Sequence, residues 1–335
     1  MAVTESDAVR VAREYREALA RNEDAALRRL ARYWLSMERE LRLSYEGLYR
    51  EIMEMQDAGE IVPEEVWMDL ERYRDMNRQI IELSGAYEDR ALDTITEYQR
   101  LDYNLGLDSA SAILQASSKY AEIWNRVDPS VVETVAGFAG NGAPLRTLLQ
   151  TDFGSLSAGI LDALVSGVGL GKGAYATAED MLKVTQKLTY TRAVRIARTE
   201  INRAYRIANA QQYAASGVVT KVLRLCYAPT ACLACLEMDG EECPNGICDD
   251  HPNGKCTTVA VTIGGHYPQW QTGHDWLMEQ SAEDQRRIMG DGRYEMWRAG
   301  MPIRDMVEMQ ANPVWGDSPQ VISEKVLRAR MDGLE

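Results

Sequence analysis

The N-terminal part of the chain has the apolar pattern of two long helices. From about residue 5 to residue 56 there is no proline, and apolar residues recur at steps of three, four and seven, which is the spacing of one helical face. Gly59 interrupts this pattern, and Pro63 with the glutamates after it has the composition of a helix start. The first stripe consists of Leu30, Trp34, Met37, Leu41, Leu48, Ile52 and Met55, and the second of Val66, Leu70, Tyr73, Ile80, Tyr87, Tyr98 and Leu101, with Asn77 and Ser84 as polar interruptions.

These stripes predict a helical hairpin over residues 1–127, and at 1.5 Å per residue each arm would be about 60 Å or more long. Two such arms bury little apolar surface against each other alone, so we expect an additional partner surface. Residues 128–187 predict a helical linker region that is broken at several glycines and at Asp128-Pro129. Its glycine cluster, residues 167–173, lacks the full phosphate-loop pattern and therefore predicts a turn between helices.

Helix is predicted from about Thr177 to about Ser216, where Gly217 ends it. The β-branched segments 218–227 and 256–263 predict two strands with a long loop between them. We therefore expect a small α/β domain over residues 188–265 with a cysteine-rich loop, residues 226–256. The tail, residues 266–335, predicts short helices at Asp275–Met289, Tyr294–Gly300, Ile303–Met309 and Ser323–Met331. The fold class is α+β, mostly α.

Charge is distributed unevenly along this chain of 335 residues and net charge −14. Residues 1–130 carry a net charge of −10, whereas residues 183–224 carry nine basic residues against Glu200 alone, a net charge of +8. An acidic protein is a poor general DNA binder, although this basic segment could meet nucleic acid or an acidic partner; a solvated helix face is the simpler interpretation. The first sixteen residues have no apolar run, and no segment is apolar enough to span a bilayer.

All six cysteines lie between Cys226 and Cys256. A CxxC pair, Cys232 and Cys235, precedes His251 and Cys256, which is a spacing typical of tetrahedral zinc sites. Disulfides and buried free thiols are the alternatives, and synthesis in a reducing cytosol weakens the disulfide interpretation. More than one set of four ligands is available, and Cys226 fits a core position best.

The sequence offers few candidates for catalysis, because it has three histidines and no nucleophile, paired-carboxylate or nucleotide motif. Glu200 lies in the apolar stripe of the helix from Tyr190 to Tyr213 and needs a partner there. Arg203 or Arg206 on the same helix, or a donor from the sheet, could supply it. A structural ion pair is a better interpretation of Glu200 than a catalytic role.

Several of these segments, taken in order, resemble the phage Mu F-like minor head proteins, a family of head-morphogenesis proteins. Two features depart from the family pattern: Ala228 and Thr230 stand where an Asp and an Arg usually precede the CxxC, and Gly254 replaces the first cysteine of an HPxCxC ending. The matching residues are Ala197 to Tyr205, Gly217-Val218, Cys232, Cys235, Asp239-Gly240, the run from His251 to Thr257, and positions of the tail from Trp276 to Gly300.

The resemblance implies a structural virion protein with no enzymatic activity. It would lie near the portal inside the capsid, in several copies, and assist head assembly and DNA packaging or ejection. Portal protein, a major capsid or scaffold protein and packaged DNA are the implied partners. Carried over by residue, the zinc ligands are Cys232, Cys235, His251 and Cys256, with Cys243 and Cys248 as alternatives, and the structural residues are Arg198, Glu200, Arg203 and Asp239. A zinc-dependent nuclease or toxin-like enzyme and a zinc-ribbon nucleic-acid binder are the competing interpretations.

Overall fold

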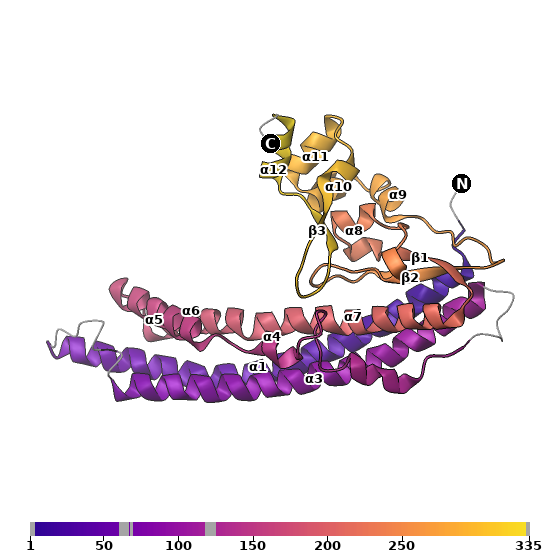
Figure 1. Ribbon diagram of the computed structural model, residues 1–335. Helices are drawn as coiled ribbons and strands as arrows, with labels where there is room; N and C mark the ends of the chain where they lie inside the picture. The colour runs from indigo at the N-terminus through magenta and orange to yellow at the C-terminus, as the bar shows by residue number, and fades with distance from the viewer. Residues whose placement is uncertain (1–3, 60–66, 68–69, 118–124, 333–335) are drawn as a thin grey trace. The chain divides into compact units, whose positions relative to one another are not determined.

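A computed structural model describes residues 4–59, 67, 70–117 and 125–332. These residues are mostly helical and form two small antiparallel sheets (Figure 1). The predicted fold class, α+β and mostly α, is therefore confirmed. None of the helices in the described part of the chain combines the length and the apolar character that crossing a bilayer requires.

The chain divides into two compact units that are each built from separate segments. Unit 1 contains residues 1–23, 98–143 and 198–335, and unit 2 contains residues 24–97 and 144–197. The four consecutive segments expected from the sequence differ from this division. The reason is that the long helices run from one unit into the other, so a boundary falls inside a helix rather than in a linker.

Both arms of the predicted hairpin are present as helices. Helix α1 spans Asp7–Asp57, and α3 spans Glu71–Ser117; the predicted start at Pro63 lies outside the described residues. The arms run antiparallel in unit 2, where Arg29 pairs with Glu97 at 2.7 Å and Arg72 pairs with Glu51 at 2.6 Å (Figure 1). Apolar residues of the first stripe are buried, including Leu30, Trp34, Met37, Leu41, Leu48 and Ile52.

Other helices of the same chain pack against these arms in unit 2. Helices α5 (Phe153–Gly169), α6 (Ala174–Leu188) and the start of α7 (Tyr190–Ser216) provide the contacts. Tyr45 hydrogen-bonds Thr185 at 2.9 Å, and Trp34 stacks on Tyr190 with ring centroids 5.8 Å apart. The glycine cluster forms the expected turn between α5 and α6, with Gly171 in the left-handed region at φ 64°.

Unit 1 is organised around the first sheet. Strands β1 (Val219–Leu225) and β2 (Thr257–Thr262) pair antiparallel, close to the predicted positions. Their apolar side chains form one cluster with the start of α1, the end of α3 and the end of α7. The segment between the strands contains η2 (Ala228–Thr230), α8 (Leu233–Glu237) and η3 (Pro244–Gly246). Before α5, the chain forms η1 (Pro129–Thr134) and α4 (Leu145–Leu149).

The tail is only partly as expected. Helices α11 (Asp291–Arg298) and α12 (Glu324–Met331) correspond to predicted helices, whereas the single helix predicted over Asp275–Met289 is divided into α9 (Gly273–Met278) and α10 (Ala282–Met289), with Ser281 capping the second. The helix expected at Ile303–Met309 is instead η4 (Ile303–Met306) followed by strand β3 (Val307–Gln310), which pairs with β4 (Ser318–Val321). Short apolar runs do not distinguish helix from strand, because tertiary pairing decides between them.

Leu101, assigned to the apolar stripe of the second arm, is 48% exposed.

Asp102 is fully buried in unit 1, and burial raises its pKa to about 7. Asn22 donates to it, Glu23 adds negative charge and Arg16 adds positive charge. The pKa of Asp102 is higher in the folded protein than in the unfolded chain. Its contribution to the free energy of unfolding is therefore fully present below about pH 4 and is lost as pH rises through 7. We expect Asp102→Asn to be more stable than the wild type at pH 8, by up to about 4 kcal/mol, and to gain nothing at pH 4.

This difference is measured by urea unfolding of both proteins across that pH range. Asp108→Asn, which changes an exposed acid on the same helix, is the control. An equal gain at pH 4 and pH 8 would contradict burial as the cause.

Candidate metal centre

The CxxC pair lies at the start of the short helix α8. Cys232 is its N-cap residue, and Cys235 lies within its first turn, 2% exposed. The helical turn closes with Leu236 N–H donating to the Cys232 carbonyl at 3.0 Å. This geometry places both sulfurs on one side of a single turn, which is why CxxC supplies two metal ligands.

His251 and Cys256 come from the loop before β2. The chain turns tightly after His251, with Gly254 N–H donating to the His251 carbonyl at 2.7 Å and Asn253 in the left-handed region at φ 65°. Asn253 N–H donates to the Thr199 hydroxyl on α7 at 3.1 Å. Arg16 on α1 donates to the Lys255 carbonyl at 2.9 Å. The loop is therefore held against two helices of unit 1.

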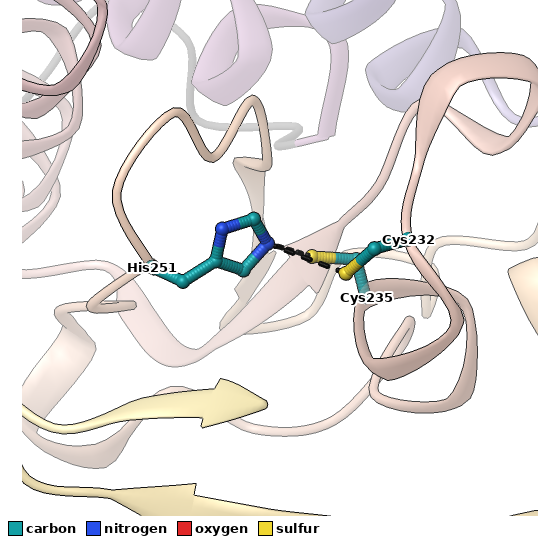
Figure 2. A group of neighbouring side chains, drawn as sticks. All are labelled: Cys232, Cys235 and His251. Carbon is teal, nitrogen blue, oxygen red and sulfur yellow. Dashed lines mark hydrogen bonds between the residues drawn. The ribbon is translucent and has the colours of Figure 1, made fainter. Parts of the chain in front are cut away.

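Three of the expected ligands converge on one point. The Nε2 atom of His251 lies 3.3 Å from the sulfur of Cys232 and 3.3 Å from that of Cys235 (Figure 2). Ligands of a tetrahedral zinc, at about 2.3 Å for sulfur and 2.0 Å for nitrogen, would lie roughly 3.5 Å apart. Cys256 is buried beside Cys235, and these two sulfurs and an Asp250 oxygen lie within 4.8 Å of one another. These cysteine and histidine groups could hold a metal ion.

The electrostatics of the group favour a thiolate. Hydrogen bonds from Cys235 and His251 lower the pKa of Cys232 to about 4. The hydrogen bond with Cys232 raises the pKa of His251 to about 9. Contacts with Cys232 and Cys256 together with burial raise the pKa of Cys235 well above its ordinary value. One sulfur is thus already suited to metal binding, whereas Cys235 and the His251 imidazolium would each lose a proton on binding.

Cys243 and Cys248, the alternative ligands, form a disulfide with each other. Both are buried in the cluster around the first sheet and belong to neither group of convergent ligands. The general preference against disulfides in a reducing cytosol therefore does not describe this pair. Cys226 is a buried thiol in the apolar cluster of the tail, as expected of a core residue.

Each of the structural residues expected from the sequence has a polar partner in the fold: Arg198, Glu200, Arg203 and Asp239. Glu200 is fully buried and accepts from Arg203 at 2.7 Å, from Trp315 Nε1 at 2.7 Å and from Gly140 N–H at 3.2 Å. Arg198 lies 3.4 Å from Glu23. Asp239 accepts from the backbone of Cys226 and Gly273 and from Trp270 Nε1, and burial raises its pKa.

Sequence reasoning missed a buried charged group next to the ligands. Asp250 is 1% exposed and accepts N–H groups from His251 and Cys256, each at 3.0 Å. Arg206 and Arg224 face it from α7 and β1 at 3.8 and 3.7 Å. The sequence shows two adjacent acidic residues, Asp249 and Asp250, directly before His251. It does not show which of the two is buried.

The departure at position 254 also has a structural reason. A Cβ atom at Gly254 would overlap the Asp250 carboxylate, so a cysteine at this position and Asp250 in its observed place exclude each other.

No protein-family model matches the chain, and searches of curated proteins and of solved structures also give no match.

Proposed function

We propose that this chain is a structural virion protein, a minor head protein of a tailed phage or prophage, and that it carries one structural zinc. It would lie near the portal inside the capsid and assist head assembly and DNA packaging or ejection. The observation that carries the proposal is the convergence of Cys232, Cys235 and His251, with Cys256 beside Cys235. A set of three sulfurs and one imidazole is typical of structural zinc sites.

The environment of the basic segment also supports a structural role over nucleic-acid binding. Six of its nine basic side chains pair with acidic side chains of the protein itself. Two of these six, Arg206 and Arg224, are also buried. Most of the positive charge of residues 183–224 is thus compensated internally and contributes little to attraction of phosphate.

The hairpin offers charge of the opposite sign. Residues 46–75 contain ten acidic and three basic residues, a net charge of −7 and half of the net charge of the chain. A basic surface on a portal, capsid or scaffold protein would complement this segment, and the association would weaken as salt rises.

The proposal is tested by co-expressing the full chain with the portal and scaffold proteins of the same phage or prophage. We expect co-purification that is weakened by salt, and one zinc per chain by elemental analysis. We also expect no turnover of DNA and no binding of duplex DNA at moderate salt. Isolation of the chain without any head component would contradict the assembly role. Metal-dependent DNA cleavage that is abolished by Glu200→Ala or His251→Ala would establish the enzymatic alternative instead.

A further inference from the structure

Asp250 has an unusual set of contacts for a buried carboxylate. Its two oxygens accept the backbone N–H groups of His251 and Cys256, at 3.0 Å each. These are the two candidate ligands that come from the loop rather than from α8. The carboxylate therefore fixes the backbone at both ends of the turn that presents the His251 ring and the Cys256 sulfur.

The surrounding charges explain how a carboxylate can be buried there. Three thiolates, one neutral imidazole and a divalent ion have a combined charge of −1, to which Asp250 adds another −1. Arg206 and Arg224, each largely buried, face this group with a charge of +2. Their Nη1 atoms have no hydrogen-bond partner, so both groups act on Asp250 itself through charge, while Arg224 also donates through Nη2 to the Asp249 carbonyl at 2.6 Å.

A direct bond from Asp250 to the metal is the competing arrangement, because Asp250 shares a group of convergent atoms with Cys235 and Cys256. Two observations disfavour it. Both carboxylate oxygens already accept N–H groups, and both face a guanidinium within 4 Å. A cation bound directly to Asp250 would meet both of these positive charges.

Provided that the proposed metal site exists, we propose that Asp250 is the residue that positions the two loop ligands. Arg206 and Arg224 compensate the charge that Asp250 adds beside the thiolates. Residues that orient metal ligands through hydrogen bonds commonly change metal affinity about 10–100-fold when they are replaced. Gly254 is part of the same arrangement, since only a residue without a Cβ leaves room for the carboxylate.

The test compares Zn²⁺ affinity of the full chain and of Asp250→Asn by competition with a chromophoric chelator. Asp249→Asn, which changes the neighbouring exposed acid, is the matched control. We expect Asp250→Asn to weaken Zn²⁺ binding about 10–100-fold and the control to change it less than about threefold. With Co²⁺ as the probe, the absorption bands of a tetrahedral site with three sulfurs and one nitrogen should keep their positions in Asp250→Asn.

Equal affinities of Asp250→Asn and the control would overturn the positioning role, and shifted Co²⁺ bands would make Asp250 a ligand instead. If Asp250→Asn does not fold, Gly254→Ala provides the second variant, because its methyl group would displace the carboxylate and should weaken Zn²⁺ binding to a similar extent. Unchanged affinity of Gly254→Ala would also count against the proposal. A wild-type chain that binds no Zn²⁺ would remove the metal site itself, a result distinct from each of these.

The compensating role of the arginines has its own measurement. Arg224→Met should weaken Zn²⁺ binding about tenfold in the wild-type chain and less than about threefold in Asp250→Asn, because the charge to be compensated is then gone. Equal losses in the two backgrounds would show that Arg224 acts independently of Asp250.

Discussion

Replacing Cys235 with serine is expected to abolish metal binding and to unfold the region of unit 1 around the cysteine-rich loop. Cys235 belongs to both groups of convergent ligands and is 2% exposed. It also packs in the apolar cluster that joins α8 to the tail, with Leu236, Leu277 and Met289. Structural zinc contributes about 10–16 kcal/mol of apparent free energy in small domains, which equals or exceeds the whole stability of a typical domain, about 5–15 kcal/mol.

Elemental analysis and near-ultraviolet circular dichroism would measure this effect, and two variants separate it from a general loss of cysteine. Cys226→Ala removes a buried thiol from the same cluster, and we expect it to keep the zinc and to cost roughly 2 kcal/mol or less. Cys243→Ser with Cys248→Ser removes the disulfide and should also leave the zinc in place. Zinc retained by Cys235→Ser would show that Cys235 is not a ligand. Zinc lost equally from Cys226→Ala would show that disruption of the shared apolar cluster alone explains the loss.

The helices and the first sheet could be predicted from the sequence because their signals are local. The stripe from Leu30 to Met55, together with the absence of proline from about residue 5 to residue 56, predicted the helix α1, and the β-branched segments predicted β1 and β2 to within two residues at either end. The proximity of Cys232 and Cys235 was predictable for the same reason, since a CxxC pair occupies a single turn. The approach of His251 was predicted from the spacing of the whole motif, which is typical of metal sites built from two short turns.

What could not be predicted depends on contacts between distant segments. The hairpin of β3 and β4 places Trp315 against Glu200 on α7, a pairing across 115 residues that no local pattern encodes. Arg206 was a candidate partner for Glu200, yet it faces Asp250, while Arg203 pairs with Glu200. Arg203, three residues from Glu200, lies on the same face of the helix, whereas Arg206 lies six residues away. The contact of Arg206 with Asp250 depends on the position of the cysteine-rich loop, which no local pattern encodes.

The same limit applies to the charge of residues 183–224. As a sequence, this segment has a net charge of +8 and predicts a basic surface. In the fold, two of its arginines point into the interior toward Asp250, and Lys221 pairs with Glu242 at 2.8 Å. The net charge of a sequence segment ignores ion pairs with acidic residues elsewhere in the chain. It therefore overestimates the attraction of this segment for nucleic acid.

Glu200→Ala is expected to destabilise unit 1 by about 3–5 kcal/mol, the usual cost of removing one partner from a buried ion pair. The carboxylate accepts from three donors on different segments: Arg203 on α7, Gly140 N–H and the Trp315 indole. Alanine leaves the Gly140 N–H and the Trp315 indole without this acceptor, and Arg203, whose side chain is only 14% exposed, keeps its bond to the Phe138 carbonyl at 2.8 Å but loses its acidic partner. Glu200→Gln keeps one acceptor oxygen and should cost less, roughly 1–3 kcal/mol.

Urea unfolding measures the free energy, and hydrogen exchange at Gly140 and at residues 311–317 reports whether these segments separate from α7. Glu241→Ala is the matched control, because Glu241 forms an exposed pair with Arg304 at 3.1 Å and its loss should change stability by about 0.5 kcal/mol or less. A structural Glu200 requires loss of stability and faster exchange together. Full stability of Glu200→Ala, combined with loss of a measurable enzymatic activity, would instead assign the carboxylate to catalysis.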